Sequence, residues 1–351
     1  MSKKLSRREF VEKSAKTIAA GALLASGAAG AAQAAKSPPK SKVVEVTADR
    51  AVRSGRKIDS KKVRQMVKKG LAALTGEKEP FKKLFNPHDK VGLKINCLGR
   101  PRIYTHHEVI NAFAEELKAA GVKPENIIVW DRFEEHMKDC GFSMKPEGPG
   151  VLVRATESYR GDNDCLDDSD PYVCSKDSPS RRQDDDSTAS RLSRIFKHDC
   201  NKHINLAILK DHGLAGVTLC LKNIAFGICD NNRRFHGPDH VNPFISDFCA
   251  KKGVMDKFSF HVIDGLEGCY DDGPCPGSEG SIFAHNTIWF SKDPVALDAL
   301  GHAVIEARRK KEGLRSLKKS GRHPKHIQMA GKLGLGNSDP GRMKIEKISV
   351  P

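Results

Sequence analysis

Residues 205–240 read NLAILKDHGLAGVTLCLKNIAFGICDNNRRFHGPDH, and they contain a strand, a helix and a polar loop in succession. The apolar run 206–209 has no alternation, which is typical of a strand covered on both faces. Charged residues follow at once at 210–212, and the apolar spacing of residues 217, 221 and 224 predicts one buried helix face. The segment 230–240 is too polar for a core. The stretch therefore places most of the plausible chemistry beside a buried strand.

The same kind of pattern recurs on both sides of this stretch. Short apolar runs predict strands at residues 91–95, 127–130, 258–263 and 287–290, and residues 343–350 add an edge strand. Helices are predicted to begin at Asp59, at His106 and at the Asp293-Pro294 cap. Strand, helix and strand in close succession is typical of a right-handed parallel crossover. We expect an α/β fold, a mostly parallel sheet flanked by helices, in one large domain spanning residues 59–351.

Two segments differ in composition from this domain. Residues 157–190 are rich in Asp and Ser and poor in large apolar side chains, so they predict a polar surface insertion. Residues 35–58 include KSPPKS and predict a linker.

The N-terminus has the pattern of a twin-arginine signal peptide over residues 1–34. SRREFV at 6–11 precedes an Ala, Gly and Leu-rich run, and an A-x-A cleavage site ends at Ala34. A membrane anchor is the alternative, but the run is short and rich in small residues. We expect a periplasmic protein that meets the twin-arginine translocase during export and keeps no stable membrane span after cleavage.

The chain has 351 residues and a formal net charge of +16. That excess favours anionic substrates, anionic lipid head groups or acidic partners. It does not favour nucleic acid, because the basic residues are dispersed and aromatic residues make up only 6% of the chain. A small anionic ligand is the partner that we expect.

Polar residues stand where several predicted strands end. Ligands of open parallel sheets bind beyond the carboxyl ends of the strands, so these residues predict one cleft. Any single one could instead be a helix cap or a loop residue. The predicted substrate-binding residues are Lys94, Asn96, Asp131, Lys222 and Asn223. The predicted catalytic residues are Lys210, His212 and Asp264.

Each residue type in this set suits a particular chemistry. Lys and Asn side chains supply donors for a carboxylate or phosphate, and a desolvated lysine serves as base or nucleophile. His212 and His236 are also candidate ligands of a metal ion, with Asp264 completing the shell or orienting a base. The cofactor is open: a metal ion fits, but the cysteines lack ferredoxin-type iron–sulfur spacing. Common nucleotide, serine-hydrolase and zincin motifs are absent.

The ten cysteines suggest one disulfide bond. Cys165 and Cys174 lie in the polar insertion, where a bridge would replace missing core. Cys269 and Cys275 flank YDDGP, and there a disulfide and metal ligation both remain open.

Four motifs give the chain a family resemblance: ILKDHGLAGVTLCLKNIAFG, the FHG that follows it, VIDGL and DPVALDALG. Together they resemble the DUF362 family, and specifically its twin-arginine-exported members. The resemblance implies the fold and export rather than a mechanism, because the family has no agreed reaction. Many members carry ferredoxin-type cysteine runs, which this chain lacks. Two classes of function remain: an enzyme acting on a small anion, and a non-catalytic periplasmic binding or redox-accessory protein.

Overall fold

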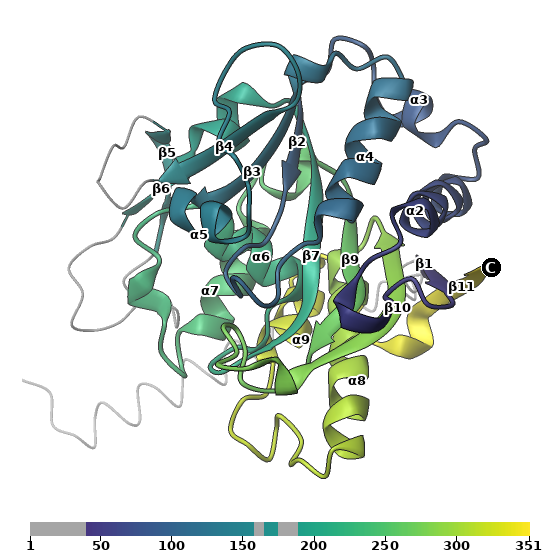
Figure 1. Cartoon of the computed structure of the whole chain (residues 1–351). Helices are drawn as coiled ribbons and strands as arrows, with labels where there is room; N and C mark the ends of the chain where they lie inside the picture. The colour runs from purple at the N-terminus through teal and green to yellow at the C-terminus, as the bar shows by residue number, and fades with distance from the viewer. Residues whose placement is uncertain (1–39, 158–164, 175–188) are drawn as a thin grey trace, which may run out of the picture. The chain divides into compact units, whose positions relative to one another are not determined.

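The computed structural model describes residues 40–157, 165–174 and 189–351, and a nine-stranded sheet runs through them (Figure 1). The strand order is β11-β1-β10-β9-β7-β2-β3-β4, with β8 paired to β7 outside this path. The strands are β1 (Ser41–Ala48), β2 (Val91–Lys94), β3 (Ile127–Phe133), β4 (Leu152–Glu157), β7 (Lys202–His212), β8 (Gly216–Val217), β9 (Phe258–Cys269), β10 (Ile282–Ser291) and β11 (Met343–Val350).

The centre of the sheet is parallel. Strands β9, β7, β2, β3 and β4 all run the same way, whereas β10 is antiparallel to both of its neighbours, β9 and β1. The carboxyl ends of the parallel strands therefore meet along one edge, where ligands of such sheets bind.

Helices cover both faces of the sheet. They are α2 (Ser60–Thr75), α3 (Pro80–Leu84), α4 (His107–Ala119), α5 (Glu134–Asp139), α6 (Leu219–Ile228), α7 (Val241–Ala250), α8 (Pro294–Lys311) and α9 (Lys325–Lys332). Asp59 caps α2 as predicted, because its Oδ1 accepts from the backbone N–H groups of Lys61 and Lys62 at 3.1 Å each.

Two hydrophobic layers hold the helices to the sheet. Helices α2, α3 and α4 pack over one face with residues such as Leu93 and Phe260. Helices α6, α7, α8 and α9 pack over the other with residues such as Leu209 and Trp289. In Figure 1, α2 and α4 lie beside each other over the first face. The predicted fold class, a mostly parallel α/β sheet flanked by helices, is confirmed.

The central strands are longer than the apolar runs predicted. β7 spans 11 residues, against the four of the run 206–209. Lys210, Asp211 and His212 remain inside the strand and are buried, because their polar atoms find partners there. A buried polar residue can thus continue a strand that hydrophobicity alone would end.

The domain begins earlier than the predicted boundary at residue 59. The predicted linker, residues 35–58, contains β1, which pairs with β10 on one side and β11 on the other. Val43, Val44 and Val46 are fully buried, so this segment is part of the core. Residues 40–351 form one compact unit. The predicted signal peptide, residues 1–34, lies outside the described residues.

The described part of the predicted insertion, residues 157–190, contributes to a separate two-stranded sheet. β5 (Leu166–Val173) pairs there with β6 (Ala189–Ser193) in antiparallel fashion. Tyr172 of β5 packs against Phe235, Phe244 and Phe248, which ties this small sheet to the core. Residues 158–164 and 175–188 lie outside the described residues.

The predicted bridge between Cys165 and Cys174 is not formed, since the described residues contain no disulfide bond. The two cysteines lie at opposite ends of β5, and the five residues of β6 paired alongside span roughly 13 Å at about 3.3 Å per residue. A disulfide needs Cα atoms within about 7 Å. The extended strand separates the residues that a loop would have allowed to meet.

The Cys269–Cys275 alternative is not formed either. Cys269 Sγ lies 3.0 Å from the carbonyl oxygen of Asp271, and the thiol of Cys275 donates to the carbonyl of Leu98 at 2.7 Å.

Within the described ranges, no helix combines the length and apolar character needed to cross a membrane.

Candidate functional site

A buried ion pair lies at the carboxyl ends of β2 and β3. Lys94 is fully buried, and its Nζ is 2.7 Å from Oδ1 of Asp131. The same amine donates to the carbonyl of Ile95 at 2.6 Å and to Oδ1 of Asn223 in α6 at 3.1 Å. All three protons of the ammonium group are thereby satisfied, which a buried lysine requires.

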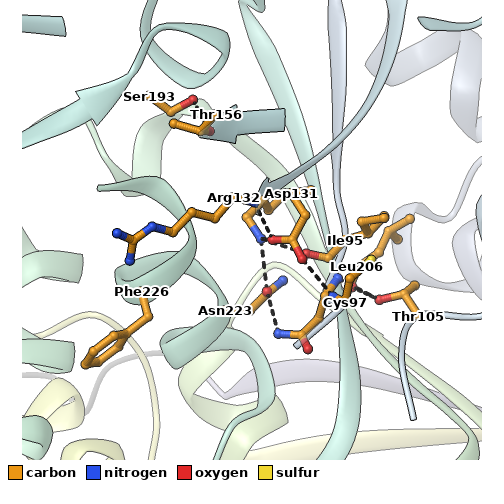
Figure 2. Close-up of polar contacts among 12 residues, drawn as sticks. Ile95, Cys97, Thr105, Asp131, Arg132, Thr156, Ser193, Leu206, Asn223 and Phe226 are labelled. Atoms are coloured by element: carbon orange, nitrogen blue, oxygen red, sulfur yellow. Dashed lines mark hydrogen bonds and ion pairs between the residues drawn. The ribbon is translucent and has the colours of Figure 1, made fainter. Parts of the chain in front are cut away.

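Amides extend this pair into a network. Asn96 donates from Nδ2 to Oδ1 of Asn223 at 3.0 Å and accepts at its own Oδ1 from Lys210 at 2.7 Å. Asn223 in turn donates to Asn205 of β7 at 2.8 Å. Figure 2 shows residues of β3, α6 and the segment after β2 converging at this point. The structure thus joins five residues that the sequence predicts for the site: Lys94, Asn96, Asp131, Lys210 and Asn223.

Asp131 links this network to the chain after β2. Its Oδ2 accepts the backbone N–H of Cys97 at 2.7 Å (Figure 2). Burial pushes the pKa of Asp131 up, but the charge and hydrogen bond of Lys94 outweigh burial and hold that pKa below its ordinary value. The carboxylate is therefore ionised and fixed in place.

Helix α6 is held by residues from outside it. Its N-terminal N–H groups at Cys220 and Leu221 donate to the carboxylate of Asp298 in α8, at 2.7 and 3.0 Å. Leu219, at the first position, has a φ of 48°, in the left-handed region that costs energy for a leucine. Gly227 leaves room for Lys94, since a Cβ there would lie 2.5 Å from the lysine Nζ. Tertiary contacts therefore set where Lys222 and Asn223 lie.

A small cavity of about 50 Å³ opens beside the network. The hydroxyl of Thr218 in its wall is buried and has no hydrogen-bond partner. Lys222, which is 2% exposed, lies with its Nζ 3.7 Å from the ring centre of Phe226. The lining residues are Asn96, Leu98, Asp131, Arg132, Phe133, His136, Thr218, Lys222, Asn223, Phe226 and Gly227.

Several basic groups lie around this cavity, where the carboxylate of Asp131 is paired with Lys94 and Arg132 with Glu157. Burial, followed by the charges of Lys210 and Arg132, lowers the pKa of Lys222 to about 7. Burial also lowers the pKa of Lys210. The nearby imidazoles are held neutral by burial and then by Lys222, with the pKa of His236 lowered to about 4 and that of His326 to about 3. An anion entering the cavity would relieve this accumulation.

The two predicted metal ligands do not form a metal site with other described residues. His212 accepts the backbone N–H groups of Leu214 and Ala215 at its Nδ1, at 3.0 and 3.2 Å. His236 packs edge-on against Phe226, with ring centres 4.5 Å apart. Among residues 40–157, 165–174 and 189–351, no group of three or more His, Cys, Asp or Glu side chains is placed to hold a metal ion. Burial and then the charge of Lys222 lower the pKa of both imidazoles, so they are neutral neighbours of that lysine.

Asp264 belongs to a second polar network, beside α4 on the other face of the sheet. Its Oδ2 accepts from the backbone N–H of His106 at 2.9 Å and lies 2.8 Å from Nδ1 of the same residue. The imidazole also contacts Glu267 at 3.2 Å, and Glu267 pairs with Arg56 at 2.8 Å. Burial lowers the pKa of His106, but Asp264 and Glu267 outweigh it and raise that pKa to about 10. Asp264 therefore orients a protonated imidazole rather than the lysines.

Several residues of the site were not among those predicted from the sequence. Thr218 lines the cavity, Asn205 supports Asn223, and Gly227 makes space for Lys94. The position of Asn205, an amide directly before a buried apolar run, could have indicated a role in the site. Gly227 had no such signal, because its role depends on a side chain 133 positions away in the sequence.

Comparison with protein families gives one result. The model of the family described as "Domain of unknown function (DUF362)" matches residues 91–303, which is more than half of the chain. The match runs from β2 into α8, and it includes every residue of the lysine and asparagine network. The searches of curated proteins and of solved structures returned no match. The matched region shows that this chain belongs to the DUF362 family.

Proposed function

We propose that this protein binds a small anionic molecule in the cavity between β3 and α6. The supporting observation is a pair of buried lysines, Lys210 and Lys222, neither of which forms an ion pair within the described residues. A buried ammonium without a counterion is costly, and a bound carboxylate or phosphate would supply the missing charge. Thr218 offers an unused hydroxyl donor in the same wall.

We also propose that the protein acts in the periplasm after twin-arginine export. The support is the SRREFV motif, the apolar run and the A-x-A site within residues 1–34. Replacing Arg7 and Arg8 with lysine should leave uncleaved precursor in the cytoplasm. A normal periplasmic yield of that variant would contradict export by this route.

Thermal unfolding tests the binding proposal. In a buffer without phosphate or carboxylate, adding phosphate or a short-chain carboxylate should raise the Tm of the wild type in proportion to the logarithm of ligand concentration. Lys222→Met should remove this shift. Lys252→Met is the matched control, because Lys252 is exposed in the turn after α7 and the variant should keep the shift.

Thr218→Val separates ligand binding from general stability. Valine has nearly the same shape and removes a hydroxyl that has no partner in the empty protein, so the stability of that protein should be unchanged or higher. The Tm shift caused by the anion should become smaller. An equal shift in the wild type, Lys222→Met and Thr218→Val would place the anion elsewhere and overturn the proposal.

Anion binding in this cavity is compatible with two functions, that of an enzyme and that of a non-catalytic binding protein. The variant Lys210→Met distinguishes them. Lys210 reaches the cavity wall through Asn96. For an enzyme, its loss should reduce the rate far more than ligand binding, whereas a binding protein loses only affinity.

A further inference from the structure

The amine of Lys222 is a buried reactive group that forms no ion pair within the described residues. It lines the cavity and is 2% exposed, and its contact is with the ring face of Phe226 rather than with a carboxylate. A lysine in such surroundings is partly protonated at neutral pH, so its charged form attracts an anion and its neutral form can act as a nucleophile. Lys94, in its ion pair with Asp131, is the contrasting case in the same site.

We propose that Lys222 is a nucleophile that forms a Schiff base with a small 2-oxo acid bound in this cavity. The inference rests on the proposed function, and it adds a reaction and a substrate class to it. Positively charged and apolar surroundings together favour the neutral amine, which is the form that attacks a carbonyl.

Basic and titratable groups from several parts of the fold act on Lys222, and the one carboxylate in the lining of the cavity, Asp131, is paired with Lys94. Lys210 lies in β7, Arg132 in β3, and Cys275 in the loop after β9. The imidazoles of His212, His236 and His326 complete the set, and each has its own pKa lowered in part by Lys222. With burial as the largest cause, this environment brings the pKa of Lys222 to about 7, so much of the amine is unprotonated at neutral pH.

The cavity restricts the size of the carbonyl compound. At roughly 10–15 Å³ for each water-sized group, a volume of about 50 Å³ holds only a few such groups. Glyoxylate and pyruvate are on this scale. A 2-oxo acid carries its carboxylate next to the carbonyl carbon, so one small molecule would place an anion near Arg132 and Thr218 and an electrophile at Lys222.

The reaction needs no oxidant or reductant. The amine nitrogen of Lys222 attacks the carbonyl carbon, and a proton moves from nitrogen to the former carbonyl oxygen to give a carbinolamine. The C–O bond then breaks with loss of one water molecule, and a C=N bond forms. Arg132, which also pairs with Glu157, and the hydroxyl of Thr218 would hold the carboxylate in the cavity. The imidazole of His136, in the same lining and with its pKa lowered to about 4 mainly by burial, would relay the proton.

Reductive trapping tests this proposal on the full mature protein. With glyoxylate or pyruvate and cyanoborohydride at pH 7, a single reduced adduct should appear on the peptide that contains Lys222. Labelling at Lys222 should be roughly tenfold or more faster than at exposed Lys252, because a lower pKa leaves far more free amine at this pH. The rate should rise between about pH 6 and 8 and then level off.

Two controls make the result decisive. Lys222→Arg keeps the charge but should abolish the single adduct, while Lys252→Arg should not. Lactate has the same carboxylate and no carbonyl, so it should compete with pyruvate and raise the Tm without giving an adduct. Labelling of Lys222 no faster than that of Lys252 would overturn the Schiff-base proposal. If lactate still raises the Tm in that case, anion binding stands, and if it does not, both proposals fail.

Discussion

At the scale of single residues, the site combines two kinds of lysine. Lys94 is neutralised by Asp131 and fully hydrogen-bonded, so it acts as a fixed support. Lys222 has no such partner, and its burial is a cost to the fold. Two variants separate these roles by their effect on stability.

Asp131→Asn should destabilise the protein by about 3–5 kcal/mol at neutral pH, because it leaves the Lys94 charge buried and uncompensated. The folded-state pKa of Asp131 is lowered, so its stabilising contribution is present above the unfolded value near 3.9 and is lost as pH falls below it. The difference between wild type and variant should therefore shrink in acid. Urea unfolding at several pH values measures this effect.

Asp199→Asn is the matched control for that variant. Its ion pair with Arg154 is 3.2 Å long and partly exposed, so its loss should cost less than about 1 kcal/mol. Equal costs for the two variants would mean that the Lys94–Asp131 pair is not a buried support.

Lys222→Met should stabilise the ligand-free protein by about 1–4 kcal/mol at pH 7, since it removes a buried amine that lacks a counterion. The folded-state pKa of Lys222, about 7, lies below its unfolded value near 10.4. The unfolded chain binds more protons between these values, so wild-type stability rises with pH there and the advantage of the variant disappears. Urea unfolding at pH 7, 8 and 9 should show the two converge, and a constant difference would contradict the assignment.

At the scale of elements, α6 is placed by its neighbours rather than by its own sequence. Asp298 caps it from α8, Leu219 enters it with a positive φ, and Gly227 lets it approach Lys94. The first turn of α6 therefore presents Lys222 and Asn223 to the ends of β2 and β3.

Gly227→Ala tests this placement. Alanine in a helix interior usually stabilises by up to about 1 kcal/mol relative to glycine. Here the added Cβ would lie 2.5 Å from the Lys94 amine, so we expect a lower Tm and a smaller anion-induced shift. Gly313→Ala is unsuitable as a control because of its positive φ. At Gly280 an added Cβ would make only an ordinary contact, 3.5 Å from Oγ of Ser278, so Gly280→Ala should change neither quantity. A stabilised Gly227→Ala would show that α6 is free to move away.

At the scale of the whole molecule, β1 at the start of the described chain pairs with β11 at its end. It lies between β10 and β11, and Val43, Val44 and Val46 enter the core. A chain that begins at Lys40 should fold as the full chain does and show the same anion-induced Tm shift. A chain that begins at Asp59 lacks β1 and exposes the edges of two strands, so it should be insoluble or fail to melt cooperatively. A soluble, cooperative fragment from Asp59 would show that β1 is dispensable.

The sequence alone determined the class of fold and much of the site's composition. Apolar runs and helix caps predict the parallel strands and flanking helices because burial and capping act locally. Polar residues at the strand ends predict Lys94, Asn96, Asp131 and Lys210, because parallel strands share one carboxyl edge, and Asn223 is predicted as a polar residue within an apolar helix. The motifs of residues 205–240, together with VIDGL and DPVALDALG, indicate the DUF362 family, to which the chain belongs.

Only the tertiary structure decided which face of the sheet each polar residue occupies. Asp264 lies within β9 and Lys94 is the last residue of β2, yet Asp264 faces α4 and binds His106, since alternate strand residues point to opposite faces. The cysteines at the ends of β5 are close in sequence but are separated by an extended strand. Tertiary structure also decides that Lys222 forms no ion pair within the described residues. That outcome depends on the distance between its amine and the nearest carboxylates, which sequence spacing does not specify.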